Sequence, residues 1–208
     1  YPQKDFKYFT NGIDPEVLQM LKEPIQRTEP KILQVLYAGT LGEGQGLDLI
    51  VPELAQLSKH QIQFKIIGDG ARKVRLEEKL RRFGCENVVI QPPIERDKLM
   101  QAYLEADVLF LHLNKQPAFL KVLPSKLFEY AATGKPIWAG IAGYAAQFAK
   151  QEIPNSAVFD PTNVSQAMTS LEKLSFSHTP RSAFVSKYLR TEIMQSMAED
   201  ILRVAKES

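Results

Sequence analysis

The feature that most constrains this chain is a regular alternation of short apolar runs with longer segments of helical periodicity. Runs such as residues 31–39 (KILQVLYAG) and 107–113 (DVLFLHL) are largely apolar, which is typical of strands buried on both faces. Between them, segments such as residues 72–84 place apolar residues three or four positions apart, as one face of a helix does. Strands that alternate with helices predict right-handed βαβ units and a parallel sheet covered on both faces. We therefore predict an α/β fold with a single doubly wound, Rossmann-like sheet over residues 1–208.

The expected elements follow one another along the chain. The expected strands are residues 31–39, 63–68, 87–90, 107–113, 136–140 and 157–160. The expected helices are residues 47–57, 72–84, 95–106, 125–133, 143–150, 163–174 and 182–208. The apolar faces of three of these helices end at Leu57, Phe83 and Ile201. Because ligands of doubly wound sheets bind beyond the carboxyl ends of the strands, the loops of interest begin at Gly39, Gly68, Pro92, Asn114 and Gly140.

Composition and charge exclude several classes of protein. With 208 residues, 44% hydrophobic and 24% charged, the chain resembles globular proteins that bury a sizeable core. Its net charge of +2 does not indicate a nucleic-acid surface, so we expect no nucleic-acid partner. The single cysteine, Cys85, cannot form an internal disulfide, and no run approaches the roughly 18 apolar residues of a membrane span. We expect a cytoplasmic protein, and the start without Met leads us to expect a domain cut from a longer chain.

The loop GTLGEGQG (residues 39–46) invites two nucleotide-binding interpretations and fits neither. A phosphate loop continues with Gly-Lys-Ser/Thr, whereas Gln-Gly stands at that place here. A dinucleotide fingerprint is Gly-x-Gly-x-x-Gly, whereas the glycines from Gly42 onward are spaced Gly-x-Gly-x-Gly. Asp69, at the end of the second strand, does stand where a ribose-binding acid would. A general anion site and a plain flexible connection both stay open for this loop.

The segment LPSKLFEYAATGKPIWAG (residues 123–140) carries the chemistry that a nucleotide needs. Pro124 suits the first turn of a helix, and Ser125 can cap its unpaired N–H groups. These N–H groups and Lys126 together favour a diphosphate, because an ammonium adds charge to the helix dipole. Glu129 lies one turn further, where a carboxylate can accept both hydroxyls of a ribose. The alternative is a capped amphipathic helix with a solvated lysine and glutamate.

Five motifs in order carry a resemblance to a known family. They are FTNGID (9–14), YAGTLGEGQGLDLI (37–50), FKIIGDGARKVRLEE (64–78), ADVLFLHL (106–113) and PSKLFEYAATGKPIWAG (124–140). Together they resemble the C-terminal half of a retaining GT-B glycosyltransferase of the family 4 type, with Pro-Ser-Lys-Leu-x-Glu-Tyr as the specific part. With GKPIWAGIAGYAAQF (134–148) included, the chain is most similar to bacterial transferases of N-acetyl-L-fucosamine in surface-polysaccharide synthesis.

The resemblance implies a donor site for a nucleoside-diphosphate sugar, with UDP favoured. In the family, the glutamate that matches Glu129 binds the ribose hydroxyls. The residues that match Ser125, Lys126 and Leu127 meet the phosphates at the start of the helix.

Further candidate donor contacts come from the loops after the second and third strands. The resemblance implies that the nucleobase rests against backbone at Pro93 and Ile94. Arg72 and Lys73 would lie beside the nucleotide, and their alternative is a basic, solvated helix face.

The chain also departs from the family pattern. Many members carry an earlier glutamate against the donor sugar, and Lys121 occupies that position here. The arginine and lysine that often hold the diphosphate are matched by Thr40 and Gln45. Lys126, with Lys121, would therefore have to neutralise the phosphates. Thr40 and Gly42 of the glycine loop are counted among the candidate donor contacts.

The resemblance further implies a metal-independent, retaining glycosyltransferase without a cofactor. A separate N-terminal domain, absent from this chain, would hold the acceptor. Membrane contact would come only through the full-length enzyme or a lipid-linked acceptor. No residue of the chain is assigned as catalytic base, and we expect the isolated domain to be inactive.

No other group of residues gives a strong signal for a metal or catalytic site. Two rival functions stay open. His60, His112 and His178 lack metal-ligand spacing, and no Asp-x-Asp pair occurs. His112 is either a crevice residue or a buried structural histidine, and Cys85 is expected to be a small buried residue. The first rival is another nucleotide- or dinucleotide-binding domain, without transferase activity, anchored on Asp69. The second is an interaction module that uses its last helix.

Overall fold

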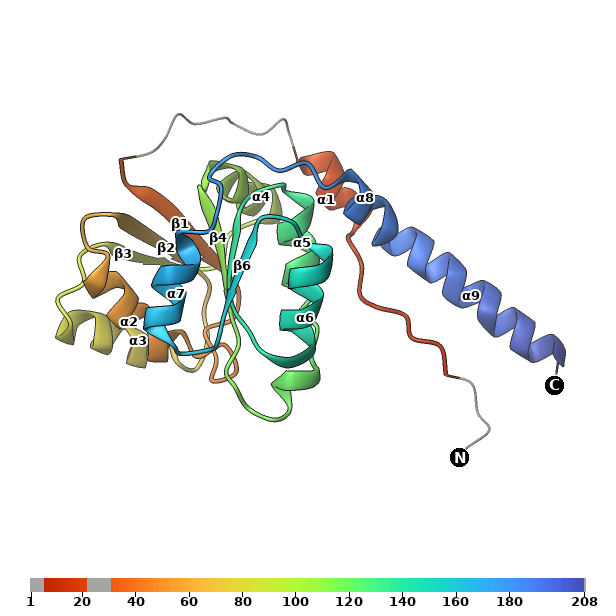
Figure 1. Ribbon diagram of the computed structural model, residues 1–208, viewed down its shortest axis with the longest axis horizontal. Coiled ribbons are helices and arrows are strands. Elements are labelled where there is room, and N and C mark those ends of the chain that lie inside the picture. Colours follow the sequence, from red (N-terminus) through yellow and green to blue (C-terminus); the bar gives the residue numbers. More distant parts are fainter. Residues whose placement is uncertain (1–5, 22–30, 208) are drawn as a thin grey trace.

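The structure, a computed structural model, describes residues 6–21 and 31–207. Within these ranges, six parallel strands form one sheet in the order β3-β2-β1-β4-β5-β6 (Figure 1). The chain first adds β1, β2 and β3 in turn toward one edge of the sheet. It then crosses back and adds β4, β5 and β6 in turn toward the other edge. This is the doubly wound arrangement that the sequence predicts. Residues 1–5, 22–30 and 208 of the predicted domain lie outside the described residues.

Most observed elements fall close to the expected ones, although the sequence predicted no helix over Pro15–Met20 or Phe119–Lys121. The strands are β1 (Leu33–Ala38), β2 (Ile62–Ile67), β3 (Val88–Gln91), β4 (Val108–His112), β5 (Ile137–Gly140) and β6 (Ser156–Phe159). The helices are α1 (Pro15–Met20), α2 (Leu47–Leu57), α3 (Lys73–Arg82), α4 (Arg96–Glu105), η1 (Phe119–Lys121, a 3-10 turn), α5 (Lys126–Ala132), α6 (Gly143–Glu152), α7 (Val164–Leu171), α8 (Ser182–Lys187) and α9 (Arg190–Glu207).

Helices cover both faces of the sheet. One apolar layer joins the sheet to α2, α3 and α7, and the other joins it to α1, α4, α5, α6 and α8 (Figure 1). Every residue of β4 and β5 is buried, as expected for strands packed on both sides. The apolar run at residues 107–113 is thereby confirmed as a central strand.

The predicted apolar faces of α2 and α3 are wrong at their last residues. Leu57 is 62% exposed and Phe83 is 37% exposed. Both lie where a helix ends and the chain turns back toward the sheet, so no neighbouring layer covers them. Gly84 has a left-handed φ of 64° and ends α3, as predicted.

The single helix predicted over residues 182–208 is also wrong, because it breaks into α8 and α9. The break occurs at residues 188–190, where the backbone pairs with that of Ile13. The Ile13 N–H group donates to the Tyr188 carbonyl oxygen at 2.7 Å. Arg190 N–H donates to the Ile13 carbonyl oxygen at 2.9 Å. These backbone groups pair with a distant segment instead of continuing a helix. Beyond the break, α9 projects away from the sheet, and Ile201 on it is 59% exposed (Figure 1).

None of the helices within residues 6–21 and 31–207 combines the length and apolar character that crossing a bilayer requires.

Candidate nucleotide site

A cavity of about 290 Å³ opens at the carboxyl ends of β1 and β2, beside the first turn of α5. β1 lies between β2 and β4, where the winding of the sheet reverses direction. Doubly wound sheets bind ligands at such a switch point. The cavity therefore lies where the sequence predicts a ligand crevice. Its lining comprises strand ends, the loop after β3 and one lysine: Ala38, Gly39, Thr40, Ile67, Gly68, Asp69, Pro93, Ile94, Leu99 and Lys126.

The wall of this cavity depends on a close approach of two backbone segments. Gly39 N–H donates to the Ile67 carbonyl oxygen at 2.9 Å, and Gly68 N–H donates to that of Gln91 at 3.0 Å. A Cβ atom on Gly68 would overlap the carbonyl oxygen of Gly39. Only glycine at position 68 lets the ends of β1 and β2 meet in this way.

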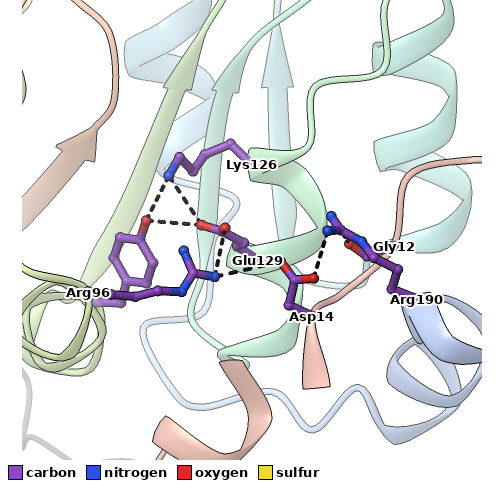
Figure 2. Close-up of polar contacts among 7 residues, drawn as sticks. Gly12, Asp14, Arg96, Lys126, Glu129 and Arg190 are labelled. Carbon is purple, nitrogen blue, oxygen red and sulfur yellow. Dashed lines mark hydrogen bonds and ion pairs between the residues drawn. The ribbon is translucent and has the colours of Figure 1, made fainter. Parts of the chain in front are cut away.

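Lys126 connects the cavity with a polar cluster behind it. The Lys126 Nζ atom lies 3.2 Å from Glu129 Oε2 and donates a hydrogen bond of 3.0 Å to the Tyr103 hydroxyl. The Tyr103 hydroxyl in turn donates to Glu129 Oε2 over 3.3 Å. Figure 2 shows the Lys126 side chain turned toward Glu129 on the same helix. One ammonium therefore borders the cavity and neutralises the carboxylate behind it.

The second carboxylate oxygen of Glu129 faces a second cation. Arg96 Nη2 lies 3.4 Å from Glu129 Oε1 (Figure 2). The Glu129 side chain is 17% exposed, so it stays within reach of solvent. A carboxylate has about four lone-pair positions, and the described neighbours supply three donors. Glu129 is therefore held on both oxygens and still has acceptor capacity.

Tyr103 is kept as a donor by its surroundings. Burial raises the pKa of Tyr103, and the nearby Tyr130 and Glu129 raise it further. The phenol therefore retains its proton at neutral pH and donates it to the carboxylate. The rings of Tyr103 and Tyr130 meet edge to face with centroids 5.2 Å apart, which favours this orientation of the Tyr103 ring.

The first turn of α5 differs from the prediction at Ser125. Ser125 is the residue before the helix, but its side chain makes no capping hydrogen bond. Its backbone is already helical (φ −55°, ψ −30°), whereas a capping serine has an extended backbone. Leu127 N–H donates to the Pro124 carbonyl oxygen at 3.1 Å, and the Leu127 side chain is fully buried. Leu127 thus offers the crevice no side chain, and its N–H group already has an acceptor.

Only some of the other residues predicted to contact the donor lie at this cavity. Thr40, Pro93 and Ile94 line the same cavity as Lys126. Gly42 lies two residues beyond Thr40 in the glycine loop, without lining the cavity. Lys121 is exposed at the end of η1 and does not line the cavity either.

Arg72 and Lys73 pair with acidic side chains. Arg72 Nη2 lies 3.2 Å from Glu43 Oε2, and Lys73 Nζ lies 3.8 Å from Asp69 Oδ1. Arg72 lines a different cavity of about 410 Å³, which Lys115 also lines. Lys73 is tied to the first cavity through Asp69, which lines it.

His112 is a buried structural residue. Its Nδ1 lies 2.6 Å from the Gln45 carbonyl oxygen, and its Nε2 accepts a hydrogen bond of 3.1 Å from Thr162 N–H. Burial lowers the pKa of His112 to about 4, so the ring is neutral at pH 7. A neutral ring that donates at Nδ1 and accepts at Nε2 satisfies both contacts. His112 thereby fastens the glycine loop to the end of β4.

Two further expectations concern metal ligands and Cys85. Across residues 6–21 and 31–207, no three His, Cys, Asp or Glu side chains gather where they could hold a metal ion. Cys85 is only half-buried, and its thiol donates to the Pro52 carbonyl oxygen at 3.3 Å. The expectation of a buried cysteine is therefore wrong, because Gly84 ends α3 at the protein surface.

Comparison with known proteins identifies the family. The sequence matches the family described as "Glycosyl transferases group 1" over residues 21–187, most of its length. The chain belongs to this family.

A curated group 1 relative matches part of the chain. Over 100 residues the chain is 35% identical to the putative colanic acid biosynthesis glycosyl transferase WcaI of Escherichia coli K12. The aligned region covers 48% of this chain and 24% of WcaI, so the chain matches about a quarter of that relative's length.

Solved structures of glycosyltransferases share the fold of this group 1 domain. Anabaena Alr3699/HepE, in complex with UDP and glucose, superposes with a TM-score of 0.69 at 20% identity, over 94% of this chain and 56% of that one. A glycosyltransferase of Rickettsia africae gives a TM-score of 0.73 at 13% identity, over 96% and 57%. The lipopolysaccharide outer core galactosyltransferase WaaB gives 0.67 at 15% identity, over 93% and 54%. The fold is thus the Rossmann-like half of a GT-B glycosyltransferase.

Sequence reasoning missed two side chains of the polar cluster in this group 1 domain. Arg96 and Tyr103 were recognised only as parts of a helix. They are seven positions apart, two helical turns, so they lie on the same face of α4. That spacing was visible in the sequence, but nothing local indicated that this face of α4 would meet Glu129 on α5.

Proposed function

We propose that this domain binds a nucleoside-diphosphate sugar, with UDP as the nucleotide, as the donor half of a glycosyltransferase. The observation that carries the proposal is that the Lys126 side chain both lines the cavity and forms an ion pair with Glu129. An anionic diphosphate in the cavity attracts the ammonium away from the carboxylate. Glu129 then has one acceptor position free on each carboxylate oxygen, because Tyr103 stays on Oε2 and Arg96 on Oε1. These two positions can accept the two hydroxyls of a ribose.

The nucleobase is proposed to lie against the loop after β3. Pro93 and Ile94, from the loop after β3, line the cavity, and Leu99 adds an apolar surface. Flat apolar surfaces suit a base, whereas Thr40 and Lys126 suit the phosphates. The lining thus combines apolar surface with a few polar groups, as ligand sites for such molecules do.

The family and the relatives support the chemical class. HepE was solved with UDP and glucose, WcaI is named for colanic acid biosynthesis, and WaaB for the lipopolysaccharide outer core. We infer a role in bacterial surface-polysaccharide synthesis. The resemblance of residues 123–148 to N-acetyl-L-fucosamine transferases makes the UDP form of that amino sugar the first donor to test.

The proposed reaction is retaining and needs no metal. Negative charge develops on the departing diphosphate as the glycosidic bond breaks, and Lys126 stabilises it. A retaining outcome asks for attack from the face that the diphosphate leaves, which depends on positioning of donor and acceptor. The acceptor is proposed to sit on an N-terminal domain of the full-length enzyme.

Calorimetry with UDP and with uridine tests the nucleotide site. We expect Lys126→Gln to weaken UDP binding by about 10-fold, the scale of one charge-assisted hydrogen bond, and not to weaken uridine binding, because uridine has no diphosphate. Glu129→Gln should weaken both ligands, because both contain the ribose. Lys150→Gln and Glu172→Gln, at exposed positions, serve as matched controls. If both site variants bind UDP as the wild type does, the assignment is wrong.

A second candidate is supported by Asp69, which lines the cavity at the end of β2. In a dinucleotide-binding domain without transferase activity, this acid would hold the ribose. NAD binding that Asp69→Ala abolishes and Glu129→Gln leaves intact would favour this candidate over the transferase.

A further inference from the structure

Arg96 stands between two carboxylates, Asp14 and Glu129, that are distant in the sequence. Its Nη2 atom lies 3.4 Å from Glu129 Oε1 and 3.9 Å from Asp14 Oδ2 (Figure 2). The Arg96 side chain is 39% exposed, so both pairs are partly screened by water. Its position therefore depends on both acids, and neither pair alone fixes a long, half-exposed side chain.

Asp14 is itself held by the corner between α8 and α9. Arg190, the first residue of α9, places Nη1 2.7 Å from Asp14 Oδ1. The same guanidinium donates through Nη2 to the Gly12 carbonyl oxygen at 3.4 Å (Figure 2). The two backbone hydrogen bonds between Ile13 and residues 188–190 lie between these contacts. Residues 12–14 and the α8–α9 corner are consequently joined by four polar contacts.

We propose that Arg96 is a positioning residue for Glu129, and that Asp14, held by Arg190, sets where Arg96 stands. This inference rests on the proposed function, in which Glu129 accepts the ribose hydroxyls. The ion chain Glu129–Arg96–Asp14–Arg190 joins the ribose site to the corner from which α9 leaves the body of the domain. Any displacement of that corner moves Asp14, and through Arg96 it changes how the carboxylate is presented to the ribose.

A nucleotide bound in the cavity leaves two of the three partners of Glu129 in place. Lys126 lines the cavity, so a diphosphate there competes with Glu129 for its ammonium. Tyr103 then remains as a neutral donor to Oε2, and Arg96 as the cation beside Oε1. The orientation of the carboxylate in the occupied site thus depends on Arg96 more than in the empty one.

The test is the ratio of the dissociation constants of 2′-deoxy-UDP and UDP, measured by calorimetry on the 208-residue chain. Loss of one hydroxyl that bonds to a carboxylate should make this ratio about 10 in the wild type. Because both ligands carry the same charge, the ratio cancels any general electrostatic effect of a substitution. It reports only how well the ribose hydroxyl is held.

We expect Arg96→Gln to lower the ratio three- to fivefold, the scale of a partly exposed ion pair, and Arg96→Lys to restore part of it. Asp14→Asn and Arg190→Gln should lower it about twofold each, because they act on Arg96 from further away. Arg96→Gln combined with Glu129→Gln should be no worse than Glu129→Gln alone, because the two residues act as one unit. Arg82→Gln and Asp97→Asn, at exposed positions, are the matched controls, and thermal unfolding checks that each variant folds.

The outcomes separate this inference from the proposed function. If Glu129→Gln abolishes discrimination and Arg96→Gln leaves it at the wild-type value, the positioning role is refuted and the nucleotide site stands. A fall with Arg96→Gln and none with Asp14→Asn or Arg190→Gln refutes the link to the α8–α9 corner. If Glu129→Gln itself leaves the ratio unchanged, the proposed function fails and this inference fails with it.

Discussion

At the scale of single residues, the central group is a carboxylate surrounded by donors. Lys126, Tyr103 and Arg96 approach Glu129 from two helices, and each can give it a hydrogen bond. Three donors on one acid are more than a surface helix needs, and a solvated lysine–glutamate pair would not involve a buried tyrosine. The cluster therefore favours a binding role for Glu129 over the plain amphipathic helix that the sequence alone also allowed.

His112 should make the protein sensitive to acid. Burial lowers its pKa from 6.5 to about 4, so the unfolded chain binds a proton that the folded chain does not bind between these values. Stability from this group is therefore complete above pH 6.5 and is lost as pH falls toward 4. We expect about 2 kcal/mol of unfolding free energy to disappear between pH 7 and pH 5, measured by urea denaturation.

Substitution of His112 isolates that contribution. His112→Gln should be less stable at pH 7, because it loses part of the contact with Gln45 and Thr162, but its stability should fall less on acidification. The lowered pKa of His178 acts in the same direction in both proteins and cancels in the comparison. His60→Gln, at an exposed position, should keep the wild-type slope. Equal slopes for wild type and His112→Gln would contradict the assignment.

At the scale of elements, α5 is fixed at its carboxyl end by a buried arginine. Arg181 donates to the Ala131 carbonyl oxygen at 3.1 Å, that of Lys135 at 3.0 Å and that of Pro154 at 2.6 Å. Burial lowers the pKa of Arg181 to about 10, which still leaves it charged at pH 7. A cation among the last carbonyl groups of a helix is favoured by the helix dipole. The helix that carries Lys126 and Glu129 is thus anchored away from the cavity.

The ends of β1 and β2 give an element-scale prediction. Gly68→Ala should destabilise the protein by roughly 3 kcal/mol and weaken UDP binding, because the new Cβ forces the backbone at Gly39 outward. Gly84→Ala is the control: its φ is 64°, and no atom lies within 4 Å of the added Cβ. It should cost about 1 kcal/mol through backbone strain alone and leave UDP binding intact. Equal costs in urea denaturation would show that the close approach is unimportant.

At the scale of the whole molecule, α9 leaves several large apolar side chains uncovered. Met194, Ile201 and Leu202 are 43%, 59% and 61% exposed. Lys7 forms an ion pair with Asp200, so the segment near the N-terminus and α9 run on the same side of the molecule (Figure 1). Apolar side chains that project from a domain in this way mark a surface for a partner. The N-terminal acceptor domain proposed for the full-length enzyme is the partner we expect there.

This arrangement predicts binding without turnover. The 208-residue chain should bind UDP but transfer no sugar, because only the donor half of the proposed cleft is present. The measurement is release of UDP from a UDP-sugar, with a polysaccharide-precursor lipid as acceptor. A protein that also carries the proposed N-terminal acceptor domain is the positive control. Acceptor-dependent UDP release by the 208-residue chain alone would contradict the proposal that sugar transfer also requires an N-terminal acceptor domain.

Most of the fold could be predicted from local sequence patterns. The apolar run at residues 107–113 and the helical periodicity at residues 72–84 each report their own element, because the order of apolar and polar residues is a local property. The errors fall at the ends of elements. Leu57 and Phe83 continue an apolar pattern past the point where the sheet covers it. The break at residues 188–189 depends on Ile13, some 175 residues earlier in the chain.

By itself the sequence determined the parallel α/β class, the crevice beyond the strand ends and the pair Lys126 and Glu129. These follow from periodicity, from turn glycines and from neighbours within one helical turn. Only the tertiary structure decided that Tyr103 and Arg96 meet Glu129, that Ser125 leaves its helix uncapped, and that Asp14 reaches Arg190. These contacts join residues that are distant in the chain, so their geometry is set by how the helices pack on the sheet, which no local pattern contains.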